Sequence, residues 1–188
     1  MINLSRATDL LARRGPDARG VWMNDTVGLG HRRLSIIDTS ENGHQPMRDV
    51  SGRYCIVYNG EIYNFRQIRD ELLPAGIPYK GGSDTEVLLY AFIHFGEKCL
   101  EKLNGFFAFA VYDEQENSLF LARDRFGIKP LYYLNDEDKF LFASDMHSLL
   151  AYGIEKQLDM ESLYTYLQLN YTAAPHTMIR GIRMLAPG

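Results

Sequence analysis

This sequence has few cysteines, no long apolar runs and no excess of positive charge. Its 188 residues include two cysteines, Cys55 and Cys99, and no Cys-x-x-Cys pair. This scarcity argues against a disulfide framework and a structural zinc site, and it favours a reducing, cytoplasmic compartment. The 20 Lys and Arg residues against 24 Asp and Glu residues give a net charge of -4, which is atypical of a nucleic-acid-binding domain.

Membrane insertion and secretion are also disfavoured. No apolar run approaches the ~20 residues that a membrane-spanning helix needs. The N-terminal stretch MINLSRATDLLARRG has basic residues but no apolar core of the kind found in signal peptides. We therefore expect a cytoplasmic protein that binds neither membranes nor nucleic acids, and we expect it to hold no metal.

The apolar patterning predicts an α+β fold with antiparallel sheets. Apolar residues recur at helical spacing over 4–13, 64–73, 84–99 and 159–168. Strands are predicted over 21–23, 27–37, 54–58, 106–112, 119–122, 131–134 and 140–143. Ser83, with Glu86 three residues later, predicts where the third helix begins. The last four strands are separated by short polar breaks, so they predict one antiparallel meander with both faces covered.

Three sets of polar residues, in a predicted strand, after a strand and at a helix start, are candidates for a binding site. Asn59 and Gly60 follow the apolar strand 54–58, and an amide side chain beside an unobstructed glycine N–H can form an oxyanion hole. The same dipeptide is also typical of a plain tight turn. Arg33 either binds a carboxylate or makes a structural ion pair, and Asp84 either receives an ammonium group or caps its helix. Together they suit a zwitterionic amino acid with a side-chain carbonyl.

Two other features are interpreted as structural. His31 and His44 have no metal-ligand partner at helical spacing, and we expect them to make structural hydrogen bonds. The basic run 123–130 lacks clustered glycines and a following helix, so it predicts a structural hairpin or an interdomain contact rather than a phosphate site.

Eight motifs then occur in order along nearly the whole chain. They are RRGPD (13–17), GLGHRRLSIID (28–38), GHQPM (43–47), YNGEIYNF (58–65), SDTEVLLYA (83–91), LNGFFAFAVYD (103–113), LFLARDRFGIKPLYY (119–133) and FAS (142–144). With these motifs the sequence resembles the glutamine-hydrolysing domain of glutamine-dependent asparagine synthetases, a class II glutamine amidotransferase domain. The resemblance implies the four-layer αββα sandwich of the N-terminal nucleophile hydrolases over residues 1–170. Residues 171–188 would form a linker toward a synthetase domain.

The resemblance also implies a chemistry and a role for each motif residue. An N-terminal cysteine would attack the carboxamide of L-glutamine, with its own α-amino group as base, and release ammonia and then glutamate. Asn59 and Gly60 would form the oxyanion hole, Arg33 would hold the α-carboxylate, and Asp84 with Glu61 would hold the α-amino group. The backbone of Leu34, Ser35, Ile36 and Ile37 would line the pocket. This domain would need no cofactor, whereas the synthetase domain would use ATP and magnesium to amidate aspartate.

The sequence departs from the family pattern at its start. Family members begin Met-Cys-Gly-Ile, whereas these residues begin Met-Ile-Asn-Leu, so the nucleophile and the first strand have no counterpart here. Cys55 lies inside a predicted strand without a free amino group beside it, and Cys99 ends a predicted helix, so neither replaces the nucleophile. We therefore expect these 188 residues alone to hydrolyse no glutamine. The alternatives are a nucleophile-free glutamine-binding or scaffolding module, and an amidotransferase domain that serves another acceptor. The oligomeric state, a homodimer included, stays open.

Overall fold

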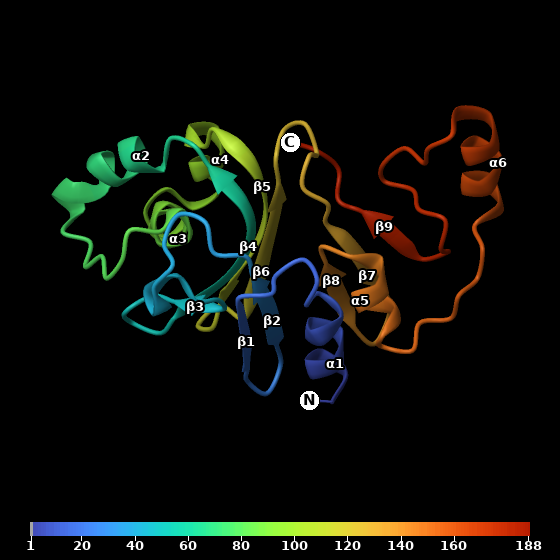
Figure 1. Cartoon of the computed structure of the whole chain (residues 1–188), viewed down its shortest axis with the longest axis horizontal. Coiled ribbons are helices and arrows are strands. Elements are labelled where there is room, and N and C mark those ends of the chain that lie inside the picture. Colours follow the sequence, from blue (N-terminus) through green and yellow to red (C-terminus); the bar gives the residue numbers. More distant parts are fainter. Residues whose placement is uncertain (1) are drawn as a thin grey trace.

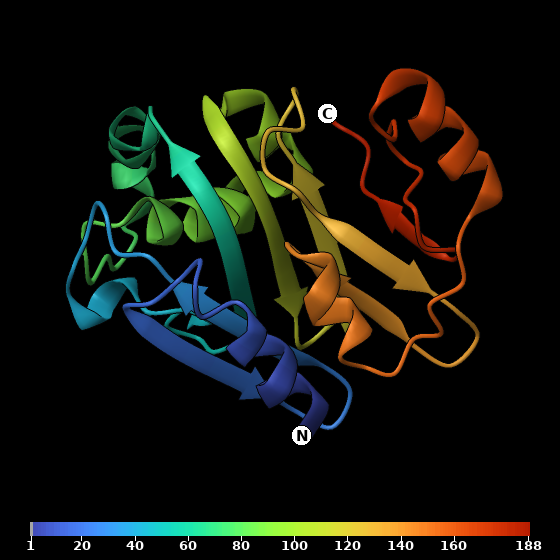
Figure 2. The ribbon, with the colours of Figure 1, turned by 45° about the vertical axis from the view of Figure 1, so that its right-hand side comes forward.

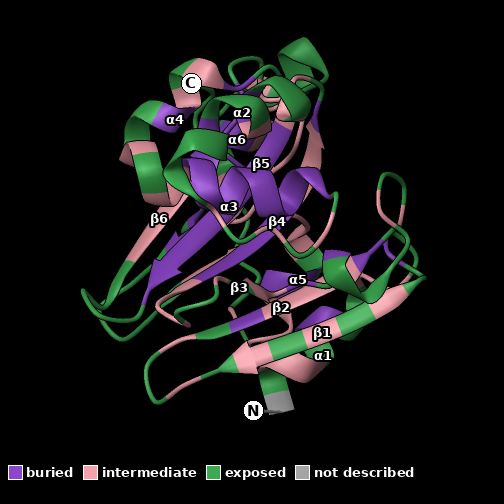
Figure 3. Ribbon diagram, turned by 90° about the vertical axis from the view of Figure 1, so that its left-hand side faces the viewer, coloured by how far each residue is buried: buried purple, intermediate pink, exposed green. Residues whose placement is uncertain are grey.

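Three antiparallel β-sheets organise the chain in a computed structural model that describes residues 2–188 (Figure 1). The central sheet has the strand order β3 (Met47–Arg48), β4 (Tyr54–Ile62), β5 (Gly105–Asp113) and β6 (Ser118–Arg123). β4 and β5 pair along nine residues each, from Tyr54 opposite Asp113 to Ile62 opposite Gly105. Both strands are apolar along most of their length because both faces of the sheet are covered, as Figure 3 shows by burial.

Helices cover one face of this sheet. They are α2 (Phe65–Leu72), α3 (Asp84–Phe95) and α4 (Cys99–Lys102), with 3-10 turns at Leu73–Ala75 and Gly96–Lys98. The predicted start of α3 is confirmed, because Ser83 Oγ accepts the N–H of Glu86 at 3.2 Å. The helix ends at Phe95, earlier than predicted, because Gly96 takes a positive φ of 59°. The side chain of Glu86 does not complete a capping box, since it accepts the N–H groups of Lys80 and Gly81.

Two smaller sheets face the other side of the central sheet (Figure 2). One pairs β1 (Ala18–Met23) with β2 (Gly28–Arg33), and the other has the order β8 (Phe140–Ala143), β7 (Tyr132–Asn135), β9 (Ile182–Met184). Helices α1 (Ile2–Leu10) and α5 (Met146–Leu150) lie against β2 and β8 on the outside. The layers are therefore α, β, β and α, and the predicted four-layer αββα sandwich is confirmed.

Several boundaries differ from the sequence-based expectation. The last four strands are not one meander, because the chain leaves the central sheet after β6 and forms β7 and β8 in another sheet. β2 ends at Arg33 rather than at residue 37. The segment that follows, 38–49, contains a 3-10 turn at Glu41–Gly43 and the short strand β3.

The C-terminal part begins with α6 (Met160–Leu169), which stands apart from the layers (Figure 1). The segment 171–188, expected to be a linker, supplies β9, and the N–H of Leu185 bonds the carbonyl of Leu131 at 2.8 Å. These residues are thus held against the domain, and their role as a linker stays a prediction. No helix within residues 2–188 is long and apolar enough to cross a lipid bilayer.

Arg123 and Asp124 form the turn that carries the chain out of the central sheet. The guanidinium of Arg123 donates to the carbonyls of Gly127, Lys129 and Leu185. The fully buried carboxylate of Asp124 accepts three backbone N–H groups, those of residues 126, 128 and 129, at 3.0 to 3.1 Å. These bonds agree with the structural interpretation of this basic run, whose lack of a binding role stays a prediction.

Candidate functional site

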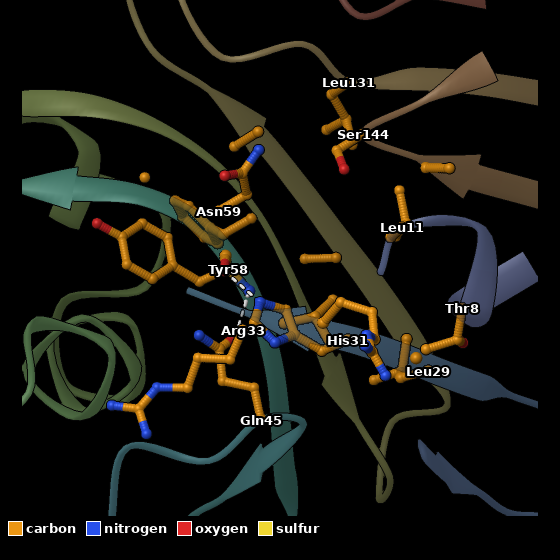
Figure 4. A pocket seen from close by; sticks show the side chains of 18 of the residues that line it. Thr8, Leu11, Leu29, His31, Arg33, Gln45, Tyr58, Asn59, Leu131 and Ser144 are labelled. Carbon is orange, nitrogen blue, oxygen red and sulfur yellow. Dashed lines mark hydrogen bonds between the residues drawn. The ribbon is translucent and has the colours of Figure 1, made fainter. Parts of the chain in front are cut away.

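A cleft of about 400 Å³ opens where β2, β4 and β8 approach one another (Figure 4). The residues that line it include Arg33, Asn59 and Asp84, together with apolar residues such as Leu11 and Leu149. In the part of the chain that the structure describes, β2 pairs with β1 alone and β8 with β7 alone. The cleft therefore lies beside two strand edges as well as beside the candidate polar residues.

Asn59 and Gly60 lie within β4, so the alternative of a tight turn after the strand is wrong. They pair with Ala108 and Phe107 of β5, which extends the strand beyond the apolar stretch. The Nδ2 atom of Asn59 is buried and has no hydrogen-bond partner among residues 2–188. An unpaired buried amide is costly, because it has lost water without gaining another partner.

The backbone N–H of Gly60 points away from β5. Tyr58 and Ile62, two residues before and after it, donate their N–H groups to the side chains of Gln45 and Asp84 on that side. Successive backbone groups alternate along a strand, so the N–H of Gly60 points to the same side. A side chain at this position would overlap the carbonyl oxygen of Phe106, which explains why glycine stands there. The two donors expected of an oxyanion hole thus occur side by side.

Asp84 is a buried carboxylate at the N-terminus of α3, and its side chain lines the cleft. Oδ2 accepts the hydroxyl of Tyr58 at 2.8 Å and the N–H of Ile62 at 3.2 Å. Burial raises the pKa of Asp84, and these hydrogen bonds lower it in part. No Lys, Arg or His of the described chain makes an ion pair with Asp84. A cationic ligand group would offset the burial of this charge.

Arg33 ends β2 and is buried at 8% exposure. Its Nη1 donates to the carbonyl of Ser40 at 2.9 Å, and its Nη2 donates to the carbonyl of Asp38. These backbone acceptors orient the guanidinium but do not neutralise it. Within residues 2–188 no carboxylate makes an ion pair with Arg33, so its charge is open to an anionic ligand.

The remaining predicted site residues divide between the cleft and its surroundings. Glu61 lies in β4 and lines the cleft, as do Leu34, Ile36 and Ile37 from the loop after β2. Ser35 is not among the lining residues, and its N–H donates to Oδ2 of Asp17 at 2.7 Å. The structure thus brings all predicted site residues except Ser35 to one cleft, while their individual roles stay predictions.

Sequence reasoning assigned no role in the site to Gln45 and Tyr58, and it considered His31 structural only. Oε1 of Gln45 accepts the N–H of Tyr58 at 2.6 Å, and Nε2 of His31 lies 3.0 Å from the carbonyl oxygen of Tyr58. Figure 4 shows His31 and Gln45 near Tyr58, the residue that precedes Asn59. The motifs GHRRL and GHQPM marked two of these residues, but no spacing in the sequence indicates that they meet at β4.

The two cysteines do not resemble nucleophiles. Both are buried, and burial raises the pKa of each thiol to about 12. Along residues 2–188 no group of three or more His, Cys, Asp or Glu side chains is arranged to hold a metal ion.

Residues 2–188 are similar to known proteins. The family model described as "Glutamine amidotransferase domain" matches residues 2–188. The chain is 43% identical to asparagine synthetase [glutamine-hydrolyzing] 3 of Bacillus subtilis, over 98% of this chain and 30% of the relative. It is 40% identical to the amidase chry2 of Gibberella zeae, over 98% of this chain and 27% of the relative. The chain therefore spans less than a third of the length of these proteins.

A solved structure shares the fold. Glutamine phosphoribosylpyrophosphate amidotransferase from B. subtilis superposes with a TM-score of 0.58 at 25% identity, over 70% of this chain and 30% of that one.

Proposed function

This chain belongs to the glutamine amidotransferase domain family, and we propose that its cleft binds L-glutamine. The α-carboxylate of the ligand would lie at Arg33, its α-amino group at Asp84 and Glu61, and its carboxamide oxygen at Asn59 and Gly60. The observation that carries this proposal is the buried Nδ2 of Asn59, which has no partner in the described chain and lies in the same cleft as an unpaired cation and an unpaired anion.

The chemistry that the site supports is hydrolysis of the glutamine carboxamide. The α-amino group of the N-terminal cysteine takes the thiol proton, the thiolate attacks the carboxamide carbon, and the developing oxyanion accepts hydrogen bonds from Asn59 and Gly60. The protonated amino group then gives that proton to the carboxamide nitrogen, and the C–N bond breaks as ammonia leaves. Water then attacks the thioester and releases glutamate and the thiol. The nucleophile in this proposal is an N-terminal cysteine, since Cys55 and Cys99 are buried and protonated. The cleft lies beside the edges of β2 and β8, and in this proposal the segment that carries such a cysteine enters there.

The ammonia would serve a second domain. Asparagine synthetases that resemble this chain are more than three times its length, so we propose that a synthetase domain takes up the ammonia and amidates aspartate with ATP and magnesium. The identity of 40% to an amidase favours a second candidate, in which the acceptor is a different molecule. Both candidates share the glutamine site.

Isothermal titration calorimetry tests the shared step. The 188-residue chain, and the same chain preceded by a segment beginning Cys-Gly-Ile, are titrated with L-glutamine and with L-norvaline, which has no carboxamide. We expect both proteins to prefer L-glutamine, and only the cysteine-led protein to release glutamate. If neither protein binds L-glutamine more tightly than L-norvaline, the proposed site is wrong.

A further inference from the structure

At one edge of β4, side chains form hydrogen bonds with the backbone groups that a neighbouring strand would otherwise pair with. β3 pairs with β4 only through Met47 and Arg48, opposite Ile56 and Cys55. At Tyr58 the pairing has ended, and the N–H and C=O groups of this residue face Gln45 and His31 instead. The buried side chain of Gln45 and the partly buried side chain of His31 thus satisfy the backbone immediately before Asn59.

The protonation of His31 follows from this geometry. A carbonyl oxygen accepts hydrogen bonds and cannot donate them, so Nε2 of His31 carries the proton and donates to Tyr58. Burial, the largest effect, lowers the pKa of His31 to about 4, which keeps the ring neutral at pH 7. Nδ1 is then a bare acceptor, buried and without a partner in residues 2–188.

Tyr58 also connects the two ends of the candidate site. Its hydroxyl donates to Asp84, where the ammonium group of the ligand is proposed to bind. Its backbone is continuous with Asn59 and Gly60, where the carboxamide is proposed to bind. A displacement of the Tyr58 peptide would therefore move the oxyanion donors relative to the ammonium site.

We propose that His31, assisted by Gln45, is a positioning residue that fixes the Tyr58 peptide so that Asn59 and Gly60 direct their donors at one point. This inference rests on the proposed glutamine site. His31 acts here through Tyr58 and not by touching the reacting atoms. Placement of donors matters, because a misplacement of about 1 Å can reduce catalysis on the order of a hundredfold.

The test compares two substitutions of His31. The variant His31→Gln keeps an N–H donor near the position of Nε2, whereas the variant His31→Leu has no donor there. We expect His31→Leu to reduce the preference for L-glutamine over L-norvaline by about tenfold and to leave the affinity for L-norvaline within about twofold, since donor placement affects the carboxamide end alone. His31→Gln is expected to restore most of the preference. The matched pair His44→Leu and His44→Gln, at an exposed histidine, is expected to change neither affinity.

Two results would overturn the proposal. One is an equal loss of affinity for both ligands in His31→Leu without rescue by His31→Gln, which would indicate a general structural role. The other is an unchanged preference in both variants.

If His31→Leu does not fold, Gln45→Met replaces it, because this variant removes the acceptor of the Tyr58 N–H at similar volume. The NMR signals of the Asn59 side-chain amide and the Gly60 N–H provide a readout without ligand. They are expected to shift in His31→Leu or Gln45→Met and to stay near their wild-type positions in His31→Gln. Unshifted signals contradict the positioning role, whereas failure of the wild-type chain to bind L-glutamine contradicts only the proposed function.

Discussion

Replacing Asn59 with leucine separates stability from ligand binding at this site. In the free protein the buried Nδ2 has no partner within residues 2–188, and an unsatisfied buried polar group costs about 1–3 kcal/mol. Asn59→Leu removes that group and replaces it with apolar atoms beside the cleft. We therefore expect the free energy of unfolding to rise by about 1–2 kcal/mol, which raises the melting temperature by about 2–4 °C for each kcal/mol in a chain of this size.

The same substitution should weaken the binding of L-glutamine. A hydrogen bond between neutral partners contributes about 0.5–1.5 kcal/mol, so loss of the Asn59 donor is expected to increase Kd between about twofold and about tenfold. Thermal melts and calorimetric titrations on the same protein samples measure both effects. A variant that gains stability and loses affinity would indicate that the unpaired amide exists for its ligand.

Asn64→Leu is the matched control. The amide of Asn64 is fully used, because Nδ2 donates to the carbonyl of Lys102 at 2.8 Å and Oδ1 accepts the N–H of Asn104 at 2.9 Å. Its replacement should lower the free energy of unfolding by about 1–2 kcal/mol and leave Kd unchanged. The reasoning fails if Asn59→Leu behaves like this control, with a lower melting temperature and unaltered glutamine affinity.

Three further predictions concern charge and pH. Asp84→Asn keeps acceptor oxygen but loses the anion, so calorimetry should show Kd for L-glutamine raised about tenfold or more, and an unchanged Kd would contradict the ammonium site. Folding lowers the pKa of His31 to about 4, so the ring is neutral in both the folded and the unfolded protein well above pH 6.5. As the pH falls from 6.5 through 4, only the unfolded protein gains the proton, and the free energy of unfolding should drop by about 3 kcal/mol. Denaturant unfolding at pH 7 and pH 4 should show a smaller drop in His31→Gln. Arg123→Ala removes three hydrogen bonds to carbonyls and should lower the free energy of unfolding by about 2 kcal/mol or more, with no change in glutamine affinity; the reverse pattern would place Arg123 in the binding site.

Local signals account for the parts of the fold that were predicted correctly. Ser83 caps α3 because its hydroxyl accepts the N–H of the residue three positions later. These two groups come close wherever an extended residue is followed by a helix, so the contact is local in sequence. The hairpins between β5 and β6 and between β7 and β8 follow from short polar breaks between apolar strands. The resemblance, and not periodicity, provided the four layers and the roles of the candidate residues.

Long-range pairing decided what the sequence could not show. Asn59 and Gly60 have the composition of a turn, yet nine residues of β5 pair with β4 and keep them in the strand. Likewise, β9 forms only because β7 offers an edge to Ile182–Met184 far along the chain. Register between distant strands depends on which edges are free after folding, and no local spacing encodes it.

The sequence by itself determined the α+β class, the capped helix and, through its ordered motifs, the family and the identities of Arg33, Asn59 and Asp84. Only the tertiary structure decided that these three side chains meet at one cleft and that His31 bonds the peptide before Asn59. The physical reason is that charge, burial and hydrogen-bond satisfaction belong to the surroundings of a group. Those surroundings come from strands and loops that are brought together only when the sheets stack.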